Sequence, residues 1–181
     1  LDANDSVRSI NATFNITSGK DGIHSDNSDD TSYPPGKQQS GLDFSYFGGI
    51  YRDVYLISTP SVYITLPQLS KTEASGGVFA ATLSAKGNKA DIAVKTEICN
   101  SEAEPKRTKL VTTIEDTDGN TLEQVSQSKV IKPAETYSFN QRINVSGIKL
   151  WHPNNPNLNF IKTEVWVDGI MVDAIKTRFG V

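Results

Sequence analysis

One stretch of sequence decides the fold of this chain: residues 90–99 read ADIAVKTEIC. From Ile92 to Ile98, every second position is Ile, Val or Thr, whereas the charged Lys95 and Glu97 lie between them. An alternation with a period of two places the two sets of side chains on opposite faces of a strand. The stretch therefore predicts a β-strand with one buried face and one face toward solvent.

The same alternation returns at residues 137–145, which read YSFNQRINV. Their apolar side chains share one face, and Asn140, Arg142 and Asn144 lie on the other. In all, strands are predicted at 61–66, 77–85, 90–99, 108–116, 121–130, 135–145, 158–167 and 169–178. Hairpin turns are predicted at 118–120 and 168–169, where Asp and Gly separate β-branched runs. Seven or eight short strands without a helical period predict an all-β, immunoglobulin-like antiparallel β-sandwich.

Composition excludes several classes of protein. The chain has 181 residues, of which 36% are hydrophobic and 22% charged. It contains no run of about 18 apolar residues, so no membrane-spanning helix is predicted. With 18 Lys and Arg against 21 Asp and Glu, it lacks the basic stripe of a nucleic-acid binder. Because Cys99 is the single cysteine, an internal disulfide is excluded. Together with two histidines in the whole sequence, it predicts neither a metal site nor a cofactor.

The chain divides into two parts of different texture. Residues 60–181 hold enough strands for a complete sandwich domain. Residues 1–59 are rich in Asp, Asn, Ser and Gly and hold few apolar residues, so we expect a loop-rich extension or the tail of another β-domain. No signal-peptide pattern opens the sequence, which leads us to expect a mature form or an excised fragment.

Residues 43–55 form the most aromatic stretch, and Gly48-Gly49 interrupts it. Its candidate interface or sugar-stacking residues are Phe44, Tyr46, Phe47, Tyr51, Arg52 and Asp53. Two interpretations stay open for the aromatic rings, which either stack on a sugar or dock one domain on another. Arg52 and Asp53 are neighbours and point to opposite faces of a strand, and an ion pair of Arg52 across a domain boundary is expected.

Three motifs carry a resemblance to a known family. Residues 48–56 read GGIYRDVYL, residues 150–158 read LWHPNNPNL and residues 178–181 read RFGV. In this order they resemble glycoside hydrolase family 2, which includes β-galactosidases, β-glucuronidases and β-mannosidases. The resemblance covers residues 25–181. It implies that residues 1–59 end a jelly-roll sugar-binding domain and that 60–181 are the immunoglobulin-like domain.

The resemblance also implies what the chain does. In the family both catalytic Glu residues lie on a barrel, which we expect to follow Val181, so no catalytic residue is expected in this chain. The parent enzyme would hydrolyse a β-glycoside, with β-galactosidase-like specificity expected, and the sandwich would act as a rigid spacer. Its partners would be the barrel, the rest of the jelly roll and a carbohydrate, in an exported bacterial protein.

Two residues are candidates for sugar contact. Asp43 stands at the offset from the GGIYR motif where an Asp of galactosidase- and glucuronidase-like relatives reaches the sugar pocket, and the alternative is a solvated loop carboxylate. Trp151 either stacks on a sugar or plugs one end of the core, and we expect the plug. Two other functions stay open for the whole chain, a stand-alone carbohydrate- or protein-binding module and a surface adhesin spacer.

Overall fold

The computed structural model describes residues 13–14, 23–24, 57–67 and 75–181. The chain separates into two compact units, Leu1–Ile57 and Ser58–Val181. In the first unit the described residues form the short antiparallel pair β1 (Thr13–Phe14) and β2 (Ile23–His24). The second unit holds the remaining strands and is described by itself below.

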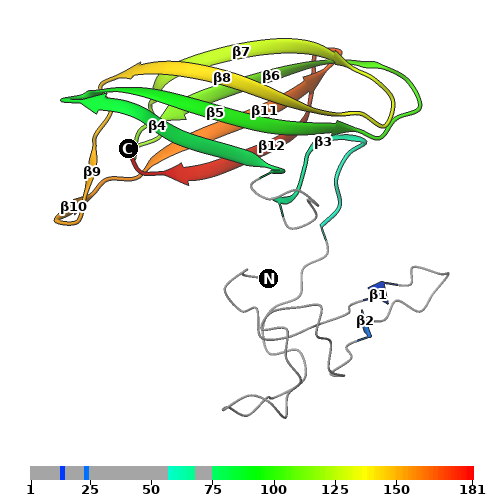
Figure 1. Ribbon diagram of the computed structural model, residues 1–181, viewed down its shortest axis with the longest axis horizontal. Helices are drawn as coiled ribbons and strands as arrows, with labels where there is room; N and C mark the ends of the chain where they lie inside the picture. The colour runs from blue at the N-terminus through cyan, green and yellow to red at the C-terminus, as the bar shows by residue number, and fades with distance from the viewer. Residues whose placement is uncertain (1–12, 15–22, 25–56, 68–74) are drawn as a thin grey trace. The chain divides into compact units, whose positions relative to one another are not determined.

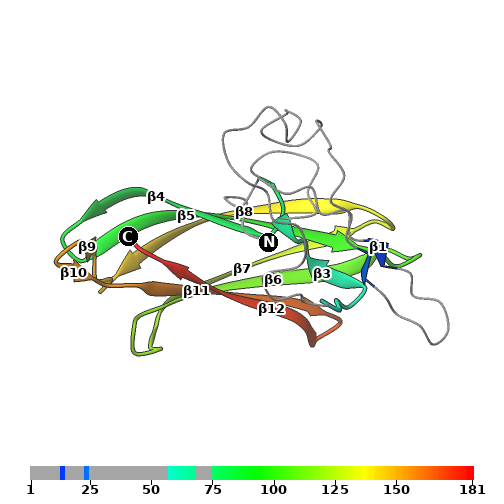
Figure 2. The ribbon, with the colours of Figure 1, turned by 90° about the horizontal axis from the view of Figure 1, so that it is seen from below.

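The second unit is a two-layer antiparallel sandwich, as predicted (Figures 1 and 2). Its strands are β3 (Val62–Ile64), β4 (Val78–Lys86), β5 (Lys89–Asn100), β6 (Lys106–Glu115), β7 (Thr121–Ile131), β8 (Thr136–Ser146), β9 (Trp151–His152), β10 (Asn155–Pro156), β11 (Asn159–Val167) and β12 (Ile170–Phe179). Each of the eight predicted strands is present, with ends shifted by at most two residues, and the hairpin β9–β10 was not predicted. Among the described residues, none forms a helix long and apolar enough to cross a bilayer.

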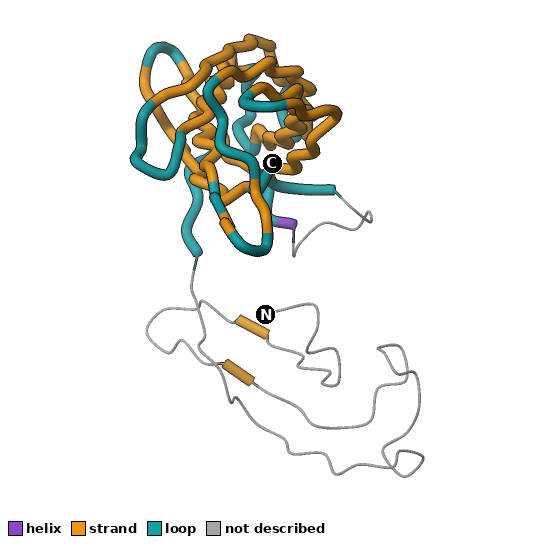
Figure 3. The backbone as a smooth tube through the Cα atoms, turned by 90° about the vertical axis from the view of Figure 1, so that its left-hand side faces the viewer, coloured by secondary structure: helices purple, strands orange, loops and turns teal. Residues whose placement is uncertain are grey.

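Two sheets make the layers. In one, which we call the β5 sheet, β3, β4 and β8 all pair with β5. In the other, the β6 sheet, the strand order is β12-β11-β6-β7. Figure 3 looks along the strands and shows them arranged around the core. The all-β, immunoglobulin-like prediction is therefore confirmed.

The inward faces carry the alternation that was read from the sequence. Buried apolar side chains form two clusters. The first cluster comprises Ala90, Ile92, Val94, Ile114, Ile143, Val145, Ile148 and Ile161. The second comprises Val62, Ile64, Ile98, Leu110, Ile131, Phe139 and Val165. Each large apolar side chain removed from water contributes about 1.5–3 kcal/mol, so these clusters supply the main driving force for folding without a disulfide.

The chain leaves the edge of β5 after β3 and returns to it at β4, and we call the part between these two strands the excursion. Strands β3 and β4 pair with successive parts of β5, and Glu97 lies between the two pairings. The backbone of Glu97 accepts a hydrogen bond from Thr65 N and donates one to Gly77 O, both at 3.0 Å. The Thr65 hydroxyl donates to Glu97 Oε1 at 2.9 Å and accepts from Gly77 N at 3.0 Å. These bonds close the base of the excursion.

A buried asparagine organises the end of β5. Asn100 is fully buried, and its Nδ2 donates to the carbonyls of Glu104, Ile131 and Lys132 at 2.9–3.2 Å. Its Oδ1 accepts a bond from Glu102 N at 3.0 Å. One side chain thus satisfies backbone groups of two loops that would otherwise lose hydrogen bonds on burial.

Both predicted hairpin turns use backbone with positive φ. Gly119 has φ +84° in the turn between β6 and β7. Between β11 and β12, Asp168 and Gly169 have φ +51° and +82°. Two successive positive φ values are typical of a type I′ turn, whose twist matches that of the paired strands. Turn chemistry and strand alternation therefore agree about the sheet register.

A substitution at Gly77 tests how tightly the base of the excursion is packed. Its φ is +70°, and an added Cβ would lie 2.8 Å from Pro67 Cγ. We expect Gly77→Ala to lower the free energy of unfolding by about 3 kcal/mol, because left-handed backbone and forced displacement both cost free energy. The control is Gly119→Ala, where φ is +84° but no atom lies within 4 Å of the added Cβ; it should cost about 1–2 kcal/mol. Equal losses in urea titrations would contradict the packing argument.

Asp91 and Arg142 form an ion pair on the outward face of the β5 sheet, and its contribution to stability can be tested. Arg142 Nε donates to both Asp91 carboxylate oxygens at 3.0 and 2.8 Å, and its Nη2 donates to Oδ2. These hydrogen bonds hold the pKa of Asp91 below its ordinary value. A depressed pKa means stability that is present above the unfolded-state pKa of about 3.9 and is lost as the pH falls through the folded-state pKa.

We therefore expect Asp91→Asn to have a lower urea midpoint than the natural chain at pH 7, with the difference closing below about pH 3. Asp118→Asn is the matched control, since Asp118 lies in the exposed β6–β7 turn. A difference that stays constant from pH 7 to pH 3 would show that the charge of Asp91 contributes nothing.

Candidate functional site

The residues predicted to contact sugar or a neighbouring domain lie outside the described part of the chain. These are Asp43, Phe44, Tyr46, Phe47, Tyr51, Arg52 and Asp53. Their roles stay predictions. Among the described residues, the remaining candidates are the carboxylates and the two motifs near the end of the chain.

Two carboxylates of the β6 sheet, Glu115 and Glu164, are engaged in ion pairs on its outward face. Glu115 lies 2.6 Å from Lys176 Nζ, and Glu164 lies 2.7 Å from Lys162 Nζ. The ammonium of Lys176 also lies 4.4 Å from the centre of the Phe160 ring. Glycoside hydrolysis needs two carboxyls across one bond, one of them an acid with a raised pKa. Glu115 and Glu164 are each paired with a lysine and not with a second carboxyl.

The two described carboxyls with a clearly shifted pKa are both shifted downward. The pKa of Asp91 is lowered by its hydrogen bonds from Arg142. The pKa of Asp116 is lowered by hydrogen bonds that its carboxylate accepts. The Asn120 side chain donates at 2.9 Å, and the backbone N–H groups of Asn120 and Asp118 donate at 2.8 and 2.9 Å. Asp116 thereby shapes the β6–β7 turn. Within residues 57–67 and 75–181, no group of three His, Cys, Asp or Glu could hold a metal ion.

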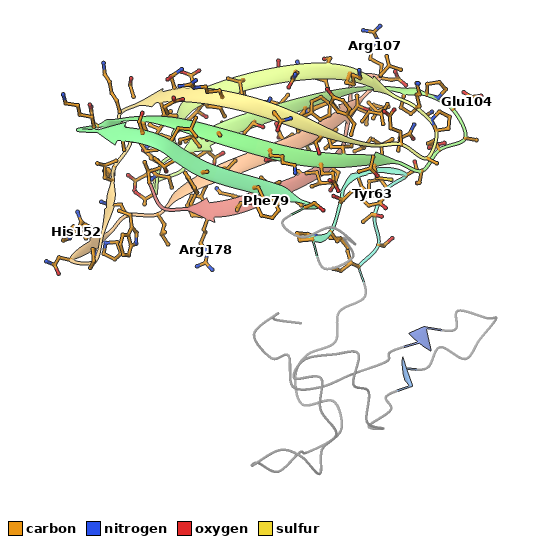
Figure 4. The ribbon with its side chains drawn as sticks, viewed as in Figure 1. Tyr63, Phe79, Glu104, Arg107, His152 and Arg178 are labelled. Atoms are coloured by element: carbon orange, nitrogen blue, oxygen red, sulfur yellow. The ribbon has the colours of Figure 1, made fainter. Side chains whose placement is uncertain are left out.

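The LWHPNNPNL motif folds into the small hairpin β9–β10, which projects from one end of the sandwich (Figures 1 and 4). Two asparagine side chains anchor it. Asn157 Nδ2 donates to Leu150 O at 3.0 Å, and Asn159 Nδ2 donates to Lys149 O at 3.1 Å. At the tip, His152 Nδ1 accepts from Asn154 N at 3.2 Å. The spacing of the motif therefore encodes a held hairpin and not a loose loop.

The structure corrects the prediction that Trp151 plugs the core. Trp151 is 47% exposed and belongs to neither apolar cluster. Its neighbour Leu150 packs against the first cluster, as does Val181. The physical reason is the hairpin, which begins at Trp151 and takes the indole out of the alternation that fills the core.

Trp151 is nevertheless fixed in place against the last residues of the sequence. The backbone N–H of Trp151 donates to Val181 O at 2.7 Å. A Cβ built on Gly180 would lie 3.4 Å from three atoms of the Trp151 side chain, so the glycine lets the chain pass close to the indole. In the RFGV motif, Arg178 is exposed and points away from the sandwich (Figure 4), whereas Phe179 packs on the first cluster. The two motifs thus meet in one rigid junction, which we call the Trp151 junction.

The comparisons with known proteins address this same region. The family model described as "Glycosyl hydrolases family 2" matches residues 77–181, which include both motifs and most of the sandwich.

The chain belongs to glycosyl hydrolase family 2.

Relatives in this family are much longer than the chain. A beta-glucuronidase of Formosa agariphila is 31% identical over 135 residues, which cover 74% of this chain and 14% of that protein. The crystal structure of Bacteroides uniformis beta-glucuronidase superposes with a TM-score of 0.71 at 27% identity, covering 86% of this chain and 18% of the other. B. uniformis beta-glucuronidase 2, covalently bound to cyclophellitol-6-carboxylate aziridine, gives a TM-score of 0.70 at 27% identity, covering 83% and 17%.

Several residues that hold the described part together were missed from the sequence. Asn100 continues the inward series of β5, and a polar residue at a buried position is a usable signal for a buried hydrogen-bond network. Asn157 and Asn159 lie among other asparagines, so nothing in the sequence distinguishes the two that anchor the hairpin.

Proposed function

We propose that this chain is the non-catalytic β-sandwich region of a family 2 glycosidase. Residues 60–181 would form a spacer, with residues 1–59 as the tail of a sugar-binding jelly roll and a catalytic barrel elsewhere in the parent protein. The observation that carries this proposal is the family match over residues 77–181. In this sandwich the carboxylates of Glu115 and Glu164 serve ion pairs and that of Asp116 serves a turn. The short coverage of the relatives supports it further.

The spacer role is supported by how firmly the sandwich margins are held. Asn100 gathers two loops at one margin, and the Trp151 junction fixes the hairpin and the RFGV motif at the other. A sugar-contacting residue displaced by about 1 Å can cost about 10²-fold in rate. A rigid spacer would keep a contact such as Asp43 within that tolerance.

For the parent reaction we propose hydrolysis of β-glycosides with retention, through a covalent glycosyl-enzyme intermediate. The family resemblance led us to expect a β-galactosidase-like specificity. The relatives compared above are β-glucuronidases, and one of them is covalently bound to a cyclophellitol carboxylate. This similarity makes β-glucuronides the first substrate class to test, with β-galactosides second.

The experiment compares the 181-residue chain with its full-length parent on chromogenic β-glucuronides, β-galactosides and β-mannosides. The parent should hydrolyse one of these substrates, and the chain alone should give no turnover above the buffer rate. Turnover by the chain that persists through repurification would contradict the proposal, as would a parent that hydrolyses none of the three.

The Trp151 junction can be tested in the parent. We expect Trp151→Ala to lower kcat/KM about tenfold or more, because loss of the indole that lies against Gly180 would loosen the RFGV motif and misplace the parts that the spacer joins. Phe79→Ala is the control, since Phe79 is an aromatic residue of similar exposure, 41%, on β4. Equal rates for the natural parent and Trp151→Ala, with both variants folded, would remove the junction from the spacer role.

The alternative of a stand-alone binding module makes a different prediction. Calorimetry of the 181-residue chain would then show affinity tighter than about 1 mM for one of the sugars, lost in Asp43→Ala or Tyr51→Ala. Absence of binding in the chain together with hydrolysis by the parent would favour the spacer.

A further inference from the structure

A belt of polar side chains crosses the core between the two apolar clusters. It consists of Thr96 on β5, Gln141 on β8, Thr112 on β6 and Thr163 on β11, and we call it the polar belt. The three threonines are fully buried. Each belongs to an alternating inward series that also holds Ile, Val or Leu. The further buried polar residues of these series, Asn100, Thr108 and Asn159, lie nearer the strand ends, whereas the belt lies between the two apolar clusters.

Strand register explains why the four side chains meet. On the β6 sheet, Thr112 and Thr163 are direct cross-strand partners. On the β5 sheet, Val94 is opposite Gln141 and Thr96 is two residues further along, so Thr96 and Gln141 are diagonal neighbours. Such pairs lie within reach of each other's side chains. The two sheets are joined here by one hydrogen bond, in which the Thr112 hydroxyl donates to Gln141 Oε1 at 2.6 Å.

This hydrogen bond leaves the belt incompletely paired. Thr96 Oγ1, Thr163 Oγ1 and Gln141 Nε2 are buried and have no hydrogen-bond partner in the protein. A hydroxyl can donate one bond and accept two, and a side-chain amide nitrogen can donate two. A buried polar atom without a partner costs about 1–3 kcal/mol, and such atoms are rare in native proteins. Three of them in one layer, contributed by both sheets, point to a shared ligand.

We propose that the polar belt is a binding site for an internal water molecule. Gln141 Nε2 donates to the water oxygen, and the two water hydrogens are donated to Thr96 Oγ1 and Thr163 Oγ1. An internal water typically makes about three such bonds. The belt contains no charged side chain, so a bound ion would lack a counter-charge, and three unpartnered polar atoms disfavour an apolar ligand.

The consequence of such a water would be a defined alignment of the two sheets. The hydrophobic effect that holds the apolar clusters is non-directional. A water bonded to β5, β8 and β11 at once is directional. Displacing either sheet by two residues would place hydroxyls against an apolar cluster with nothing to bond. The site would thus be structural, and it is independent of the function proposed above.

The test uses the ¹⁵N,¹³C-labelled 181-residue chain. Water-selective NOE and ROE spectra should show a long-lived water at the Gln141 Nε2 protons and at the Thr96 and Thr163 methyl groups. Thr163→Val keeps the side-chain shape and removes the hydroxyl, so it should abolish or weaken the Gln141 cross-peak and lower the urea midpoint. Thr121→Val is the control, because Thr121 is exposed, and it should leave the cross-peaks unchanged.

The opposite outcome is equally well defined. If the hydroxyls are without any partner, no long-lived water will be detected and Thr163→Val will raise the urea midpoint, because it removes an unsatisfied buried group. That result would overturn the proposal. Should Thr163→Val not fold, Thr96→Ser retains the hydroxyl and should keep the cross-peaks at the Gln141 Nε2 protons and the Thr163 methyl group. Loss of these two cross-peaks in the folded variant would also count against the site.

Discussion

Pairing with β5 is the constraint on which the rest of the sandwich depends. Strands β3, β4 and β8 all take their register from β5. Its inward face runs from Ala90 to Asn100 and contributes to both apolar clusters and to the polar belt. A slip of one residue would turn this whole face toward solvent. Because Cys99 is the one cysteine of the sequence, an internal disulfide is excluded, and this register must be held by burial, turn geometry and hydrogen bonds.

Most of the fold could be predicted because its signals are local. The alternation of residues 90–99 and the Asp168-Gly169 turn each require only neighbouring residues to be read correctly. The features that were missed depend on contacts between distant parts of the chain. Trp151 reads as a core residue until the hairpin that displaces it is known. The closure of the β3–β4 excursion depends on Thr65 and Glu97, whose sequence positions give no hint that they meet.

The candidate site could be predicted less well than the fold, and the reason is physical. A glycosidase site is assembled from several segments, and the resemblance places its catalytic pair beyond this chain. In the described part, charged groups such as Glu115 and Asp116 are committed to ion pairs and turns. The Trp151 junction joins two motifs of the family at one end of the sandwich, and this arrangement is what the proposed spacer role rests on.

If β5 and its neighbours suffice to hold the sandwich, residues 58–181 need nothing from residues 1–57 to fold. Equilibrium urea unfolding of residues 58–181, measured by circular dichroism beside the 181-residue chain, tests this most directly. We expect a single cooperative transition in the shorter protein, with a midpoint equal to that of the main transition in the full chain. An unfolded or markedly destabilised shorter protein would show instead that the first unit completes the core.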